Sequence, residues 1–297
     1  DKSVKELGME KMLHDLEAIW SVMAFEHDVH GRTGTILIKS TEELVETLED
    51  NQVQLQNLMT SKYIAFFLEE VSGWQKKLST TDSVMTIWQE VQRTWSYLES
   101  IFIGSEDIRR QLPEDSKRFD GIDKDFKACM EDAKGNLNVV HATNKAGLYE
   151  QLESMQDRLT LCEKSLAEYL ETKRLAFPRF YFVGDEDLLE IIGNSKAIGK
   201  LQKHFKKMFA GVHGLLLSED EKTILGVTSK EGEELKYVTP VDTLKFPKIN
   251  EWLGLVEKSM KESLATGLAQ STSSYAAIMM NDNLSPKEFF EWLDTSQ

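Results

Sequence analysis

The sequence predicts a mainly α-helical protein made of packed helical bundles, with a small antiparallel β-hairpin and a small β-meander as insertions. Three observations support this fold class. The chain of 297 residues contains only five prolines, so few positions forbid a helix. Long segments repeat apolar residues at gaps of three and four, which is the period of a helix with one buried face. Short runs rich in residues that favour strands are confined to two regions.

We expect two domains. Residues 1–176 are expected to form a helical bundle with a β-hairpin near 25–38. Residues 177–297 are expected to form a mixed part, with short helices, a meander near 215–240 and C-terminal helices. The boundary falls at Phe177-Pro178, because proline lacks an N–H donor and disfavours the helical conformation of the residue before it.

The first helix is expected over residues 7–23, whose apolar positions are Met9, Leu13, Leu16, Trp20 and Met23. The hairpin follows, with turn residues at 31–34. Thr41 and the acidic residues after it are typical of a helix start, and this helix is expected to continue to Leu68 or beyond.

The next helix is expected over residues 82–102, and its apolar face includes Trp88, Trp95 and Phe102 as core residues. A further helix follows Pro113, and residues 135–147 are expected to be irregular. An apolar seam of under four heptads then runs from Leu148 to Tyr169, which fits either a coiled coil or a helix in a packed bundle. Its short length favours the bundle.

The second domain begins with an aromatic run, which is expected to be a buried strand or an extended crossing. The core residues expected here are Phe177, Pro178, Phe180 and Phe182. Asp185 is expected to be the N-cap of a short helix that stops at Gly193-Asn194.

A helix is then expected around Ile198–Met208, followed by strands near 215–217, 223–228 and 235–238. A helix containing Ile249 and Leu264 comes next. Ser285-Pro286-Lys287-Glu288 has the form of a capping box and predicts a final helix.

Composition excludes several classes of function. A net charge of −15 opposes non-specific binding of DNA or RNA. No apolar run reaches the roughly 18–20 residues that a membrane span needs. Two cysteines in a chain of this size indicate a reducing compartment. We expect no signal peptide, and a start at Asp1 is typical of an excised fragment.

Two patterns approach known sites without matching them. Residues 193–201 resemble a phosphate-binding loop, but five residues separate Gly193 from Gly199 and Leu201 stands where Ser or Thr would hold magnesium. His27 and His30 have no third ligand nearby in sequence. We therefore expect no catalytic, cofactor-binding or metal-binding residue in this chain.

A basic cluster stands out in this acidic chain. Its members are Lys196, Lys200, Lys203 and Lys207. They form either a solvated helix face or a docking face for an acidic partner, and the sequence leaves both open.

Several stretches resemble the dynein heavy chains, and the cytoplasmic branch in particular. They include the run from Phe177 to Lys196, the run from Leu201 to Gly211, the run from Trp88 to Phe102 and Pro247 to Leu253. The resemblance covers most of residues 44–264 and points to the linker, an elongated arm N-terminal to the AAA+ ring.

The resemblance implies a mechanical role. The linker would couple ATP-driven changes of the AAA+ ring, its partner in the same heavy chain, to minus-end-directed movement along microtubules. ATP and Mg would be bound in that ring, and this segment would be no enzyme by itself. The parent motor would be a cytoplasmic, cytoskeleton-associated homodimer with accessory chains, and would bind neither nucleic acid nor membrane. The alternatives are a stand-alone non-catalytic helical scaffold and an ATP-binding enzyme that uses residues 193–201.

Overall fold

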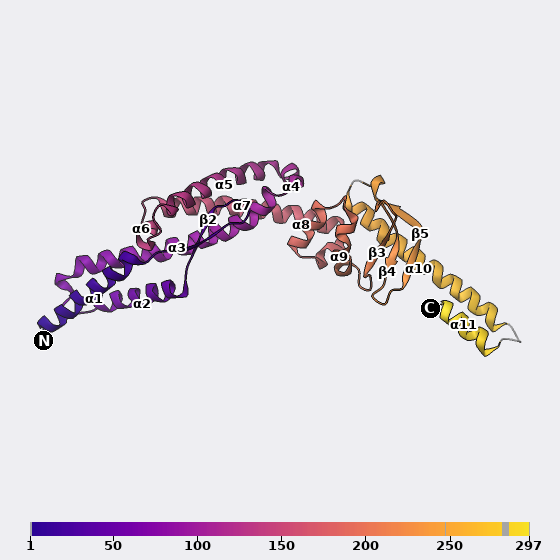
Figure 1. Ribbon diagram of the computed structural model, residues 1–297, viewed down its shortest axis with the longest axis horizontal. Helices are drawn as coiled ribbons and strands as arrows, with labels where there is room; N and C mark the ends of the chain where they lie inside the picture. The colour runs from indigo at the N-terminus through magenta and orange to yellow at the C-terminus, as the bar shows by residue number, and fades with distance from the viewer. Residues whose placement is uncertain (1, 247, 281–284, 297) are drawn as a thin grey trace. The chain divides into compact units, whose positions relative to one another are not determined.

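A computed structural model describes residues 2–246, 248–280 and 285–296. It is mainly helical, with two small antiparallel sheets (Figure 1), so the expected fold class of helical bundles with small β insertions is confirmed. Within these described residues, no helix combines the length and the apolar character needed to cross a membrane. The chain divides into two compact units, Asp1–Leu166 and Ala167–Gln297, and the division falls inside a long helix.

The first unit contains most of the helices. They are α1 (Lys2–Val22), α2 (Glu42–Met59), α3 (Leu68–Phe102), α4 (Glu106–Gln111), α5 (Pro113–Lys134), α6 (Val139–Thr143) and the first part of α7 (Leu148–Ala176). Strands β1 (Glu26–Val29) and β2 (Ile36–Lys39) form the hairpin, and η1 (Ile64–Phe66) is a short 3-10 helix.

Helix α3 supplies much of the core of the first unit. The expected core residues Trp88, Trp95 and Phe102 are each at most 1% exposed. Trp95 stacks on Phe126 at a centroid distance of 4.4 Å, and Phe102 stacks on Phe119 at 5.5 Å. The apolar seam of α7 is buried from Leu148 to Leu166. The helix therefore packs in a bundle, and this seam is not exposed for pairing in a separate coiled coil.

The β-hairpin is attached to α3 by polar contacts. The side chain of Gln92 accepts a hydrogen bond from Ile38 N and donates one to Ile38 O. At the hairpin turn, Arg32 Nε lies 3.0 Å from Oε2 of Glu99, a carboxylate that is almost completely buried.

Three boundaries in the first unit differ from the sequence prediction. Helix α2 ends at Met59 instead of reaching Leu68, because Thr60 and Ser61 turn the chain back onto the last carbonyls of the helix. Helix α3 begins at Leu68 instead of 82, since Val71 and Leu78 already lie in the core. Residues 135–147 include the short helix α6, which Asn138 caps through the N–H of His141.

The second unit combines short helices, a meander and a helical pair. Its elements are the end of α7, η2 (Pro178–Phe182), α8 (Asp185–Gly193), α9 (Ile198–Met208), β3 (Gly214–Leu217), β4 (Thr223–Thr228), β5 (Glu234–Asp242), η3 (Thr243–Lys245), α10 (Ile249–Met279) and α11 (Pro286–Ser296). The sheet order is β3-β4-β5, and α10 packs against β5.

The register of β4 and β5 shifts beside Gly226. A Cβ atom at Gly226 would lie 2.2 Å from the carbonyl oxygen of Leu235, so glycine allows the two backbones to approach here.

The capping box predicted for α11 is present, with Ser285 N donating to Glu288 and Glu288 N donating to Ser285 Oγ.

The aromatic run is a 3-10 helix, not the strand or extended crossing expected from the sequence. Three residues per turn place Phe177 and Phe180 together, with their rings 5.0 Å apart in the core. Phe182 is 70% exposed and Pro178 is also exposed, so neither is a core residue. Pro178 instead begins the 3-10 helix, where its missing N–H costs nothing.

The N-cap of α8 is also one residue earlier than expected. Gly184 is the N-cap, and Asp185 is the first helical residue. The carboxylate of Asp185 accepts a hydrogen bond from Arg174 at 2.6 Å, which ties the start of α8 to the end of α7.

Candidate functional site

The main cluster of chemically active side chains lies between α8 and α9, in the second unit. Asp187 and Glu190 are three apart on α8 and therefore point to one side of that helix. His204 on α9 faces both of them. Acidic residues are favoured in the first turn of α8 by the helix dipole, and the apolar face of α9 brings the ring of His204 inward.

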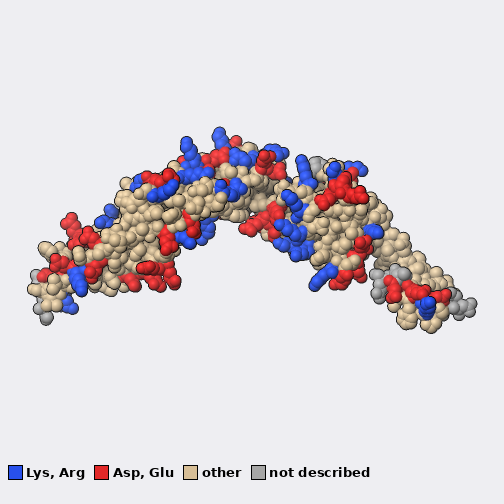
Figure 2. Space-filling view, viewed as in Figure 1, with Lys and Arg blue, Asp and Glu red and all other residues tan. Residues whose placement is uncertain are grey.

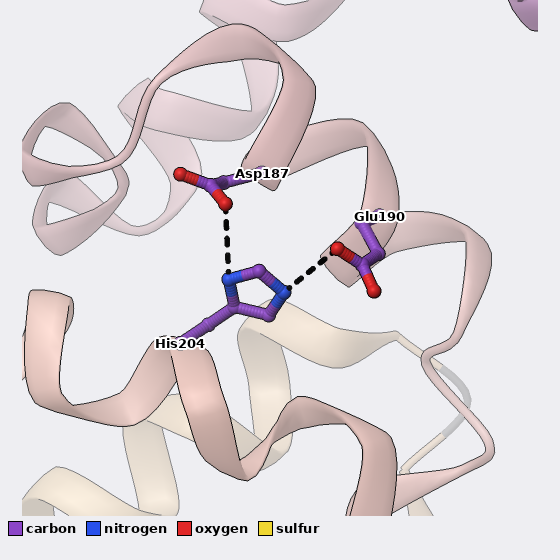
Figure 3. Close-up of side chains that lie close together, drawn as sticks. All are labelled: Asp187, Glu190 and His204. Carbon is purple, nitrogen blue, oxygen red and sulfur yellow. Dashed lines mark hydrogen bonds and ion pairs between the residues drawn. The ribbon is translucent and has the colours of Figure 1, made fainter.

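The imidazole of His204 lies between the two carboxylates (Figure 3). Its Nδ1 is 3.4 Å from Asp187 Oδ1, and its Nε2 is 3.2 Å from Glu190 Oε2. The residue is only 1% exposed, and its Nδ1 makes no hydrogen bond with the described residues. The ring is therefore a buried polar group with one nitrogen unsatisfied.

Two lysines of α9 complete this cluster. Lys203 Nζ lies 2.6 Å from Glu190 Oε1, and Lys207 Nζ donates to Asp187 Oδ2. Each carboxylate thus offers one oxygen to a lysine and the other to His204. We call these five residues the α8–α9 ion cluster.

The lysines keep both carboxylates ionised. A hydrogen bond from Lys207 is the largest cause that lowers the pKa of Asp187 below its usual value. A hydrogen bond from Lys203 does the same for the pKa of Glu190. His204 adds smaller contributions in the same direction to both pKa values.

Asp187, Glu190 and His204 also have the donor atoms of a metal site, within 4.8 Å of one another. The geometry favours ion pairs over a bound cation for two reasons. The two ring nitrogens face different carboxylates, so a single ion cannot use both contacts. A divalent cation would also have to displace two ammonium groups that already neutralise the carboxylates.

The structure separates the four lysines of the predicted docking face. Lys203 and Lys207 are engaged in the α8–α9 ion cluster, whereas Lys196 and Lys200 are exposed and form no ion pair with any described residue. Basic and acidic side chains lie interspersed on the visible surface of both units (Figure 2). A docking role for these lysines therefore depends mainly on Lys196 and Lys200.

The stretch that resembles a phosphate-binding loop has the wrong surroundings for phosphate. Helix α8, not a strand, precedes it. A Cβ atom at Gly199 would lie 2.9 Å from Glu221 Oε2, so a carboxylate occupies the space beside this glycine and would repel a phosphate.

His27 and His30 have different environments. His27 is exposed on β1. His30 Nδ1 lies 2.9 Å from Thr33 Oγ1, and its ring packs at 5.0 Å against Trp95.

The sequence prediction missed the α8–α9 ion cluster. A signal was present, because His204 falls between Leu201 and Met208 at helical spacing on an otherwise apolar face. The partner residues could not be found from spacing, since they belong to another helix.

Comparisons with known proteins identify the chain's relatives. Residues 1–271 match the family model "Dynein heavy chain, N-terminal region 2". The chain is 57% identical to "Dynein beta chain, ciliary" of Tripneustes gratilla and 54% identical to "Dynein axonemal heavy chain 9" of Homo sapiens, each over 93% of this chain. It is 41% identical to "Dynein heavy chain, cytoplasmic" of Drosophila melanogaster over 98% of this chain. The chain spans only 6% of the length of each of these relatives.

Proposed function

The chain belongs to the dynein heavy chain family, and we propose that it forms part of the linker of a dynein motor. In this role it couples ATP-driven changes of the AAA+ ring to minus-end-directed movement along microtubules. The observation that carries the proposal is the match of residues 1–271 to the N-terminal region of the family. Long packed helices such as α3 also suit an element that transmits force, because such packing resists bending.

The proposal assigns ATP and Mg to the ring of the parent motor and not to this segment. The carboxylate beside Gly199 and the helix before it support that assignment. The AAA+ ring of the same heavy chain is the proposed partner. Homodimerisation with accessory chains is proposed for the parent motor as a whole.

The cellular branch is better supported as axonemal than as cytoplasmic. The sequence motifs suggested the cytoplasmic form, and that suggestion is not confirmed, since both branches occur among the relatives. The ciliary and axonemal relatives share 45–57% identity, against 39–41% for the cytoplasmic ones. We propose an axonemal motor, and imaging of the tagged full-length protein in ciliated cells tests this. A diffuse cytoplasmic signal that is absent from cilia would contradict it.

Helix α7 provides the test of the mechanical role, because it continues through the division between the two units. A flexible Gly-Ser-Gly-Gly insertion between Leu166 and Ala167 is introduced into the full heavy chain. The matched control carries the same insertion after Lys230, in the exposed turn between β4 and β5. The α7 insertion is expected to reduce gliding velocity while ATP hydrolysis continues, and the control is expected to leave both unchanged. Equal gliding velocities for the two proteins would refute the mechanical role.

The docking face is a finer part of the proposal. We propose that Lys196 and Lys200 contact an acidic surface of the ring. Changing both to Gln is expected to slow gliding at low salt without changing the melting temperature, because exposed charges contribute little to stability. A matched control changes Lys76 and Lys230 to Gln, which are exposed lysines elsewhere on the chain. If the two pairs of changes have the same effect, Lys196 and Lys200 belong to a solvated face.

A further inference from the structure

The two halves of helix α10 have different surroundings. In the first half, Trp252, Leu253 and Val256 are buried, and Ser263 Oγ accepts a hydrogen bond from Val238 N of β5. The other positions of this half include charged residues that are exposed or half-buried. The first half is therefore an amphipathic helix that packs on the sheet of its own unit.

The second half of α10, residues 264–279, contains no charged side chain, although 29% of the residues in the chain are charged. Most of its residues are exposed. The large apolar ones include Leu264, Leu268 and Met279, with exposed fractions of 55%, 70% and 58%. A helix face that water covers usually carries charged residues, whereas the cores of interfaces are depleted of them. This half has the composition of an interface.

The polar residues of the second half are also compatible with a covered face. The hydroxyls of Thr266 and Thr272 donate to carbonyl oxygens four residues earlier in the same helix. Burying these threonines would therefore leave neither hydroxyl proton without an acceptor. The groove beside them is shallow and is lined mainly by short side chains, namely Ala265, Thr266, Ala269, Gln270 and Ser273. Short side chains allow a second helix to approach closely.

The second half of α10 has little intrinsic stability as a helix. Gly267 and several Ser and Thr residues have low helix propensity, and without charged residues there are no ion pairs along it. Most helical stability in proteins comes from tertiary packing. Helix α11 lies beside the last turns of α10 (Figure 1), where Trp292 Nε1 donates to Ser274 Oγ at 2.8 Å and its ring lies 5.4 Å from that of Tyr275. This contact supplies the packing only in part, because Leu264 and Leu268 stay exposed.

We propose that the segment of the heavy chain that follows α11 packs as a helix along Leu264 and Leu268, and completes a bundle with α10 and α11. Since Trp292 lies beside Tyr275, α11 runs back along α10 and its C-terminal end points towards Leu268. The matching family model describes an N-terminal region, and the chain spans only 6% of the length of its relatives, so the relatives have ample chain for this role. The proposal rests on family membership and not on the mechanical role.

The test places the photoreactive amino acid benzoylphenylalanine at position 268 of the full heavy chain. After irradiation, mass spectrometry is expected to find cross-links to peptides that follow Gln297 in the same polypeptide. The same amino acid at position 161, which is exposed on α7, is the control and is expected not to cross-link to those peptides. Cross-links from position 268 to an accessory chain, a covalent heavy-chain dimer, or no cross-link at all would overturn the proposal.

Hydrogen exchange gives an independent readout. Amides of residues 264–279 are expected to exchange about tenfold slower in the full heavy chain than in the 297-residue chain, because a covered helix opens less often. Amides of residues 84–102, in the buried part of α3, are the control and are expected to exchange equally in both proteins.

Leu268→Glu is expected to restore fast exchange of residues 264–279 in the full heavy chain, since the proposed helix would otherwise bury an unpaired charge. Equal exchange of this segment in the parent heavy chain and in the 297-residue chain would refute the proposal. That outcome would not affect the gliding test of the α7 insertion, so the two proposals fail separately.

Discussion

Trp95 has three different kinds of contact with its surroundings. Its ring stacks on Phe126, it packs at a tilt against the ring of His30, and its Nε1 donates to Asp123 Oδ1 at 3.1 Å. The residue is completely buried, so truncation would leave a large cavity and an unpaired acceptor.

We predict that Trp95→Ala lowers the free energy of unfolding by about 3–5 kcal/mol, the usual cost of removing a large buried aromatic side chain. Urea denaturation of the chain measures this. The matched control is Leu161→Ala, at a helix position that is 50% exposed, and its cost is expected to stay below about 1 kcal/mol. Similar losses for the two variants would show that Trp95 is not a core residue.

The two cysteines are the other residues for which the environment decides the chemistry. Burial is the largest cause that raises the pKa of Cys129 to about 11, and burial likewise raises the pKa of Cys162 to about 11. At pH 8 only about one thiol in a thousand is then ionised, and the thiolate is the reactive form.

Both thiols are therefore predicted to react slowly with a chromogenic disulfide reagent at pH 8 in the native chain. Two equivalents are expected to react at once after unfolding in urea, which provides the control. Rapid reaction of either thiol in the native chain would contradict this prediction.

At the scale of elements, the pair formed by Arg32 and Glu99 is one of the contacts that join the hairpin β1–β2 to α3. Glu99 lies on α3 and is 1% exposed, while the side chain of Arg32 is 49% exposed. Because Arg32 is half in water, the pair itself contributes modestly, but a lone buried carboxylate would be costly.

We predict that Arg32→Gln destabilises the chain by about 1–3 kcal/mol, the cost of leaving a buried polar group unpaired. Adding Glu99→Gln to Arg32→Gln should recover part of that loss, because the uncompensated charge is then gone. Urea melts of the parent, the single variant and the double variant check this. A double variant that is less stable than Arg32→Gln would contradict the explanation.

Periodicity in the sequence predicted the elements whose cores are regular. The seams of α3 and α7 and the apolar face of α9 lie where their spacing placed them. The sequence predictions that were wrong have local causes. The aromatic run of residues 180–182 has strand composition, but Pro178 favours the start of a short helix. The early start of helix α3 was missed because its first turns include Gly73 and several exposed polar residues, which weaken the apolar period in that part of the helix.

The α8–α9 ion cluster shows a different limit of prediction from sequence, because its residues come from two helices. The lysines of α9 were visible in the sequence as a stripe, but their partners on α8 follow from packing between two helices. Spacing within one helix cannot reveal that Lys203 and Lys207 are engaged and that Lys196 and Lys200 are not.

At the scale of the whole chain, the prediction concerns ATP. The 297-residue chain is expected neither to bind nor to hydrolyse ATP, because its loop-like stretch follows a helix and lies beside Glu221. Titration calorimetry with MgATP is expected to give no saturable heat, and Lys200→Ala serves as the matched variant. Micromolar binding that disappears in Lys200→Ala would contradict the prediction.

The close approach of backbones at Gly226 has a consequence for inherited variation. Every amino acid other than glycine carries a Cβ, and at this position that atom would overlap the carbonyl oxygen of Leu235. Any missense allele at this codon is therefore expected to reduce the amount of folded protein, whatever side chain it encodes. Such alleles are expected to act by lowering the protein level, whereas changes at exposed lysines are expected to leave that level normal, so measuring the protein level would distinguish the two.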